Sequence, residues 1–347
     1  MDSGFIRASG AGKMRVNRKI FPHLFFSSLR LQNFSLPKLS FTGDHIFKIL
    51  CALITSSTIL ILGLMAYELI VGSRLSIETF GFFGFIAGTE WDPAIKRVFG
   101  ALPLILGTLT TSAIALLIGF PISLGVALAL SEYMPKKLSF IFSFLVELLA
   151  AVPSVIYGLW GIYILVPFLR DNVYPLLQAA LGFIPLFSGP IYGGGVLTGG
   201  IVLAIMIIPI ISAVLRDLFS SVPPSIREAV ISLGATKWET VKIVMSYTRS
   251  GILGATMLGL GRAVGETMAI TMVIGNKFKV FPSSLFDAWY TMSAIIANEL
   301  LEATYDLYIS ALINVGLLLL LINLLIVILA RLIVWRSLRM VRGIIRE

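Results

Sequence analysis

An arginine and a glutamate, Arg262 and Glu266, stand four residues apart inside an apolar stretch, residues 258–275, that is long enough to cross most of a bilayer. In a continuous helix this spacing places both charges on one face, one turn apart. A charged side chain at membrane depth costs at least about 2.5 kcal/mol. The pair therefore predicts either an ion pair that locks helices together or a path for a charged solute, and intramembrane charges more often indicate the second.

A further carboxylate, Glu147, also lies inside an apolar stretch. Two positions for it remain open from the sequence. It could pair with Arg262 across a helix bundle, or it could lie at a hydrated helix end. The apolar helices that contain these charged residues must position them.

Composition indicates an integral membrane protein. Of 347 residues, 57% are apolar and 13% charged, and the mean hydropathy is +0.96. The only cysteine is Cys51, which excludes an internal disulfide, and the only histidines are His23 and His45, which argues against a histidine-based metal or catalytic site. The net charge of +9 comes from basic residues beside apolar segments, a pattern typical of membrane topology and not of nucleic-acid binding.

Six apolar runs predict an all-α membrane domain with six transmembrane helices. We expect these helices near residues 46–71, 101–130, 138–168, 195–219, 250–275 and 306–335. Several runs exceed the roughly 20 residues needed, so we expect tilt or bending, notably at Pro121, Pro153 and Pro209.

The lysines and arginines orient these helices. Twenty of the 27 lie in the N-terminal tail, the second-to-third loop, the fourth-to-fifth loop and the C-terminus, and six lie in the other three loops. The positive-inside rule therefore predicts that both termini are cytoplasmic. Residues 1–45 have no sustained period and are expected to form a mobile cytoplasmic tail, followed by one six-helix domain over 46–340.

The loop at 220–245 carries helix signals of its own. Ser225 with Glu228, and Thr236 with Glu239, both fit a capping box, and Gly234 suits the left-handed residue after a helix. An apolar stripe is expected from Ile226, Ala229, Val230 and Leu233. Two short helices that turn at Gly234 are therefore predicted, either resting on lipid headgroups or docking into a partner's groove.

These motifs resemble those of ABC importer permeases. Glu228-Ala229 followed by Gly234 is similar to their EAA loop, and Gly259-Leu-Gly-Arg-Ala-Val-Gly-Glu-Thr-Met-Ala resembles the PstC-type phosphate permeases. Further similar stretches lie at 88–93, 99–109, 147–161, 205–209 and 297–299, so the resemblance covers about residues 46–340. In two places the sequence departs from the family pattern: Val230 replaces alanine, and Met245-Ser246 replaces Leu-Pro, which would let the second loop helix continue into the fifth transmembrane helix.

The resemblance implies a type I ABC importer permease of the bacterial cytoplasmic membrane. Implied partners are a PstA-like second permease subunit, a dimeric cytoplasmic ATPase that uses ATP and Mg²⁺, a periplasmic or extracellular phosphate-binding protein, and the lipid bilayer, with no nucleic acid. The chain has no phosphate-binding loop sequence, so we expect it to bind no cofactor and to hydrolyse no ATP. Glu228, Ala229 and Gly234 would couple to the ATPase.

In such a permease Arg262 would supply the fixed positive charge that an anion path needs. Glu266 would compete for the guanidinium and keep anion binding weak enough for release. Thr267 would add a hydroxyl donor, although threonines in membrane helices more often bond their own backbone. Glu147 completes the expected path residues. The alternatives are a permease for sulfate or molybdate, or a self-sufficient secondary transporter, although no internal repeat supports the latter.

Overall fold

The structure is a computed structural model that describes residues 43–279 and 281–344. Most of the predicted tail, residues 1–42, lies outside the described residues. The chain divides into two compact units, Met1–Leu60 and Ile61–Glu347, and the boundary falls inside α1 (Gly43–Gly72). The second unit contains all the predicted site residues.

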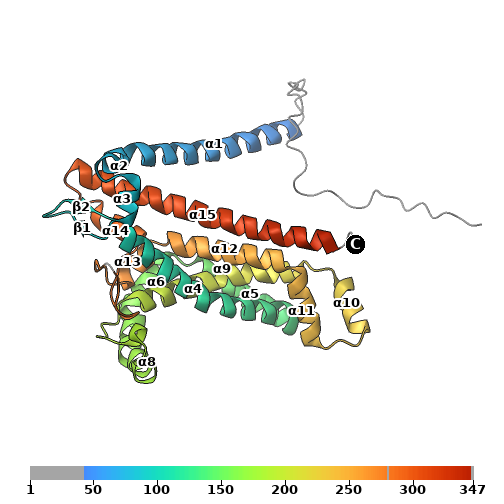
Figure 1. Cartoon of the computed structure of the whole chain (residues 1–347). Coiled ribbons are helices and arrows are strands. Elements are labelled where there is room, and N and C mark those ends of the chain that lie inside the picture. The colour runs from blue at the N-terminus through green and yellow to red at the C-terminus, as the bar shows by residue number, and fades with distance from the viewer. Residues whose placement is uncertain (1–42, 280, 345–347) are drawn as a thin grey trace, which may run out of the picture. The chain divides into compact units, whose positions relative to one another are not determined.

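The described residues are mainly helical, with one small hairpin (Figure 1). After α1 come α2 (Arg74–Phe80), α3 (Phe82–Ala87), β1 (Trp91–Asp92), β2 (Val98–Phe99), α4 (Leu102–Leu128), the π-helical turn η1 (Ala129–Tyr133), α5 (Lys136–Ala151), α6 (Ser154–Trp160), η2 (Gly161–Leu165), α7 (Val166–Phe168), η3 (Leu169–Val173), α8 (Tyr174–Leu181) and the 3₁₀ turn η4 (Pro185–Phe187). The second half comprises α9 (Val196–Ser220), α10 (Pro224–Ser232), α11 (Lys237–Tyr247), α12 (Arg249–Gly265), α13 (Met268–Val273), α14 (Met292–Glu299) and α15 (Asp306–Ile344).

Four of the six predicted membrane helices are present as single spans. They cover Ile46–Gly72, Leu102–Tyr133, Val196–Ser220 and Asp306–Leu332. Each is an uninterrupted apolar run of more than 20 residues, which is the strongest helix signal a membrane sequence carries.

The third predicted segment is a pair of helices with a sharp bend between them. Lys136–Ala151 and Ser154–Leu181 are both apolar, but they meet at an angle of 89°. Pro153 has no backbone N–H to donate and pushes the preceding Val152 into an extended conformation, with ψ at 128°. The bend that the sequence predicts at Pro153 is therefore confirmed, and it divides the segment into two parts.

The fifth segment is also interrupted. Helix α12 ends at Gly265, Glu266 is extended with ψ at 132°, and a new helix, α13, begins at Met268. Glycine is a poor helix former, and Gly265 directly precedes the break. The spacing alone suggested that Arg262 and Glu266 share one face of a continuous helix. The break shows that they do not.

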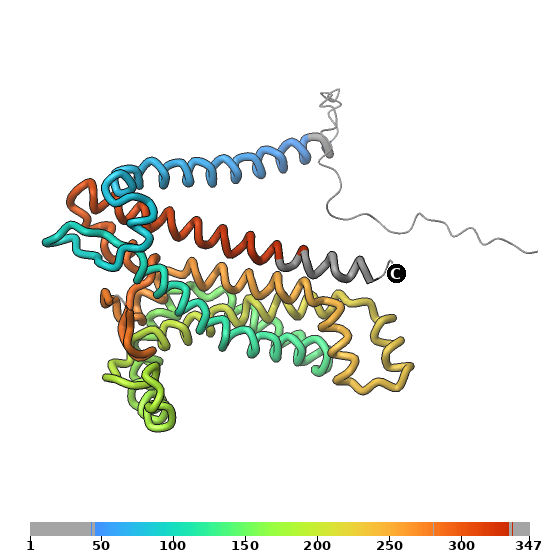
Figure 2. The backbone as a smooth tube through the Cα atoms, viewed as in Figure 1, coloured from blue at the N-terminus to red at the C-terminus, as the bar shows by residue number. Residues whose placement is uncertain are grey.

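The helices α4 and α9 form the centre of the second unit (Figure 2). They approach closely because small residues lie between them: a side chain at Gly119 would collide with Ile207, and one at Gly200 with Ile114. Helix α12 packs on the same pair, with Gly259 against Ile211. This core holds α10 and α11 at one end of the unit and the β1–β2 hairpin and α14 at the other (Figure 1).

Candidate functional site

The break between α12 and α13 sets the geometry of the predicted charge pair. Arg262 lies in the last turn of α12, where the helix dipole favours a cation. Glu266 is buried, with its side chain 7% exposed, and its Oε1 accepts a hydrogen bond from the Ala269 N–H at 3.3 Å. The backbone carbonyl of Glu266 accepts a hydrogen bond from the buried Ser293 Oγ at 2.7 Å. The glutamate is thus fixed in place by α13 and α14.

The contact between the two charges is loose. Arg262 Nη2 lies 4.0 Å from Glu266 Oε2, which is an ion-pair distance but too long for a hydrogen bond. Among the described residues, the guanidinium makes only this ion pair. Its side chain remains 42% exposed, so its donors are available to a further group.

Arg262 belongs to an exposed stripe on α12. Gly254, Leu258, Arg262 and Gly265 follow one another at spacings of four, four and three residues, and all four are exposed. A side chain added at Gly254 or Gly265 would meet nothing within 4 Å. Open space therefore lies beside Arg262 at Gly265, whereas the buried Gly259 allows α12 to pack closely on Ile211.

The other two predicted path residues, Thr267 and Glu147, make no hydrogen bond or ion pair with Arg262 among the described residues. Thr267 Oγ1 donates to the Gly265 carbonyl at 3.3 Å, so its hydroxyl bonds the backbone. Glu147 does not pair with Arg262. Its Oε1 lies 3.0 Å from Nη2 of Arg216, near the C-terminal end of α9, and Arg216 also pairs with Asp217. Of the two positions left open for Glu147, the pairing with Arg262 is therefore not found, and its side chain is 55% exposed.

The loop predicted at 220–245 forms two short helices, as expected. Thr236 and Glu239 make the predicted capping box at the start of α11. Gly234 has a φ of +83°, the left-handed conformation expected after α10. The second predicted capping box is wrong: Pro223 precedes α10, and no side chain caps it. Pro224 already supplies a favourable first residue for that helix.

The surface of this loop is partly apolar and open. Glu228, Ala229 and Gly234 are all exposed. The predicted apolar stripe divides between two faces, because Ile226 packs on the core whereas Leu233 is 88% exposed. Ile231 and Trp238 are also more than half exposed.

Helix α11 does not continue into α12 despite the missing Leu-Pro. Thr248 separates them with φ −95° and ψ 8°, and its Oγ1 donates to the Val244 carbonyl at 2.9 Å. The backbone N–H of Thr248 donates to the same Val244 carbonyl at 3.0 Å, so the end of α11 is closed by both groups of Thr248.

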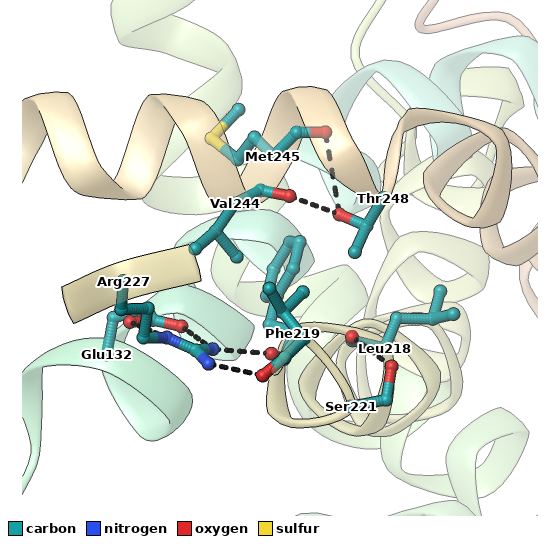
Figure 3. Close-up of polar contacts among 9 residues, drawn as sticks. Glu132, Leu218, Phe219, Ser221, Arg227, Val244, Met245 and Thr248 are labelled. Carbon is teal, nitrogen blue, oxygen red and sulfur yellow. Dashed lines mark hydrogen bonds and ion pairs between the residues drawn. The ribbon is translucent and has the colours of Figure 1, made fainter. Parts of the chain in front are cut away.

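Arg227 and Glu132 form an ion pair that the sequence does not predict (Figure 3). Arg227 Nη2 and Nε donate to the two carboxylate oxygens of Glu132 at 2.7 and 3.3 Å. The same guanidinium donates to the carbonyls of Phe219 and Val222, both at 2.6 Å. No local signal could reveal this pair, because its members are 95 residues apart.

A third glutamate, Glu299, lies partly buried at the opposite end of the unit. Glu299 Oε2 accepts hydrogen bonds from Trp91 Nε1 at 2.8 Å and Tyr308 Oη at 2.7 Å. Burial raises the pKa of the Glu299 carboxyl, and the two hydrogen bonds only partly oppose this. These contacts join the β1–β2 hairpin to α14 and α15.

Comparison with known proteins yields one family. Residues 119–338 match the model of the binding-protein-dependent transport system inner membrane component. The phosphate transport system permease protein PstC of Mesorhizobium japonicum is 46% identical, over 79% of this chain and 84% of that protein. The PstC proteins of Haemophilus influenzae and Pasteurella multocida are 45% and 42% identical, over 84% and 95% of this chain and 93% and 97% of those proteins.

A solved structure shows the same fold. A bacterial ABC transporter involved in the import of the acidic polysaccharide alginate contains a chain with a TM-score of 0.52 and 19% sequence identity, over 85% of this chain and 98% of that one. At this identity the likeness concerns the fold alone.

Proposed function

Because this chain belongs to the family of binding-protein-dependent transport system inner membrane components, we propose that it is a permease subunit of an ATP-driven importer of inorganic phosphate. The relatives that share 42–46% of their residues with it are named phosphate permeases. The chain is a multi-pass protein of the cytoplasmic (inner) membrane, with both termini on the cytoplasmic side, where the basic loops lie.

The main support for the proposal is the environment of the Arg262 guanidinium. The Arg262 side chain is 42% exposed and lies 4.0 Å from the Glu266 carboxylate, so its hydrogen-bond donors are available to a passing oxyanion. The buried Glu266 is hydrogen-bonded to α13, so it attracts the guanidinium without occupying it. Weak competition of this kind allows an anion to bind and leave.

Partners complete the path. The exposed stripe of Gly254, Leu258, Arg262 and Gly265 would face a PstA-like second permease subunit, so the anion would pass between the two chains. A phosphate-binding protein would deliver the anion at the end that holds the β1–β2 hairpin and α14. This chain binds no cofactor, and a dimeric cytoplasmic ATPase uses ATP and Mg²⁺.

The open apolar surface of α10 and α11 would contact that ATPase. Glu228, Ala229 and Gly234 lie on it, and Leu233 presents an exposed apolar side chain. Helices α10 and α11 are anchored to the unit's core through Ile226, Val241 and Val244, so movement of the ATPase would be transmitted to the membrane helices.

The test is reconstitution in liposomes. The complete complex should accumulate labelled phosphate when ATP and the binding protein are supplied, and an excess of sulfate or molybdate should not compete. The chain alone should neither hydrolyse ATP nor carry phosphate. Phosphate flux from the lone chain would identify a secondary transporter instead, and strong competition by sulfate or molybdate would identify another oxyanion as the substrate.

A further inference from the structure

The Arg227 guanidinium connects three helical elements at the end of the unit that carries α10 and α11. It projects from α10, pairs in bidentate fashion with Glu132 on η1, and donates to carbonyls at the end of α9. The element η1 continues α4 directly. One side chain therefore links the loop to both helices of the central α4–α9 pair (Figure 3).

This arrangement is well satisfied and mostly shielded from water. The Glu132 side chain is 9% exposed and that of Arg227 is 22% exposed, and Phe219 and Val222 are fully buried. The carbonyls of Phe219 and Val222 lie at and just beyond the last turn of α9, where helix carbonyls lack partners and the helix dipole favours a cation. A planar guanidinium is suited to bonding a carboxylate and these carbonyls at once, and an ammonium is not.

The ion pair is a second attachment, separate from the apolar packing of the loop. Val241 and Val244 of α11 pack with Phe219 and Val222 in the same core cluster. Apolar contacts of this kind have little directional preference, so the loop could shift along them. Directional hydrogen bonds at Arg227 fix α10 to the ends of α4 and α9 in one register.

We propose that Arg227 and Glu132 form a positioning pair that transmits motion of the ATPase-coupling loop to the α4–α9 pair. When α10 moves with the ATPase, the ion pair makes the ends of α4 and α9 move with it. Without the pair, α10 stays docked on the ATPase but moves partly independently of the membrane helices. This role rests on the proposed function, since it requires that α10 and α11 contact an ATPase.

The experiment uses the complete complex of both permease subunits, the ATPase and the binding protein, reconstituted in liposomes. Three variants test the pair: Arg227→Gln removes the charge, Arg227→Lys keeps the charge without the planar fork, and Glu132→Gln removes the carboxylate. Lys137→Gln is the matched control, because it removes an exposed cation from the nearby start of α5. The measurements are the amount of ATPase that co-purifies, the ATP hydrolysis rate, and the phosphate moved per ATP hydrolysed.

We expect Arg227→Gln to retain the ATPase and to hydrolyse ATP while moving about tenfold less phosphate per ATP. Arg227→Lys and Glu132→Gln should lose less, since each keeps part of the hydrogen-bond set, and Lys137→Gln should match the wild type. The ratio of phosphate to ATP does not depend on how much complex is recovered, so reduced yield would not mimic the effect.

Two results would overturn the role in transmission. One is a wild-type ratio of phosphate to ATP in Arg227→Gln. The other is loss of the co-purifying ATPase from Arg227→Gln and Arg227→Lys alike, which would make Arg227 part of the docking surface. Failure of the wild-type chain to retain an ATPase would instead reject the proposed function itself.

Discussion

Two of the arginine–glutamate pairs, Arg227 with Glu132 and Arg262 with Glu266, differ in distance and in exposure. Arg227 pairs with Glu132 at 2.7 Å and is 22% exposed, and it also donates to two backbone carbonyls. Arg262 approaches Glu266 at 4.0 Å and is 42% exposed. The first guanidinium has its donors satisfied by the protein, and the second does not.

An arginine near a glutamate can therefore have two roles, depending on where the hydrogen-bond donors of its guanidinium go. A guanidinium whose donors are used internally stabilises one arrangement of helices, because removing either partner leaves a poorly solvated charge. A guanidinium held near a carboxylate that is already bonded elsewhere keeps its charge without a fixed partner. The sequence indicates a possible pairing only for Arg262 and Glu266, which are four residues apart, and not for Arg227 and Glu132, which are 95 residues apart.

The largest expected effect is the loss of transport when Arg262 and Glu266 are changed together. If Arg262 contacts the anion, Arg262→Gln with Glu266→Gln should assemble normally and transport phosphate at least about 100-fold more slowly. Arg262→Lys should restore transport only in part, because lysine keeps the charge and loses the fork. The measurement is labelled-phosphate uptake beside the amount of assembled complex.

The contrary outcome for that experiment is informative. A double variant that transports like the wild type, and better than either single variant, would make Arg262 a helix clamp. The two arginines would then have the same role, and the comparison between them would fail.

The second effect is on the free energy of unfolding. Here a change at Arg227 should have the larger effect and a change at Arg262 the smaller, the reverse of the order expected for transport. Arg227→Met should lower the free energy of unfolding by about 3 kcal/mol, because Glu132 is left buried without a cation. Arg262→Met should lower it by less, because Arg262 is 42% exposed and lies 4.0 Å from Glu266 Oε2, and the buried Glu266 keeps the hydrogen bond from the Ala269 N–H. Unfolding of the isolated chain in detergent would show this, and an equal loss in both variants would contradict the distinction.

A third effect concerns the turn that presents the loop. Gly234 has a φ of +83°, and valine in that conformation costs about 1–2 kcal/mol. Gly234→Val should therefore weaken ATPase association roughly tenfold, whereas Gly234→Asn is the matched control because asparagine tolerates this conformation. Co-purification of the ATPase is the readout. Wild-type association and uptake in Gly234→Val would exclude a docking role for this turn.

The smallest effect involves Glu299, whose hydrogen-bond partners are neutral. Burial raises its pKa above the ordinary value of 4.5, so the folded state binds more protons than the unfolded state just above that pH. Its contribution to stability is therefore present at lower pH and is lost as the pH rises through the raised pKa. Glu299→Gln should remove this pH dependence from the unfolding midpoint, whereas the exposed Glu302→Gln should retain it. An unchanged slope in Glu299→Gln would show that Glu299 does not titrate in this window.

Local sequence signals predicted the features that depend on near neighbours. Four membrane spans follow from uninterrupted apolar runs, and Thr236 caps α11 because Glu239 lies one turn away. Gly234 adopts a positive φ, as its place after a helix predicts. Ser225 fails as a cap because the proline pair before it already sets the start of α10, so one local signal replaced another.

The pairing of the buried and half-buried charged side chains depends on tertiary packing and could not be predicted from the sequence. Both interruptions, at Pro153 and at Glu266, occur inside runs whose hydropathy reads as continuous. The bend at Pro153 gives Glu147 to Arg216, and the packing of α4 on α9 brings Glu132 to Arg227 across 95 residues. Hydrogen bonds and ion pairs depend on distances to within a fraction of an ångström, whereas hydropathy is an average over a whole helix and carries no such information. The hydropathy of the sequence therefore predicts which segments enter the membrane. The packing of those segments determines that the donors of Arg227 are bonded within the protein and that those of Arg262 are not.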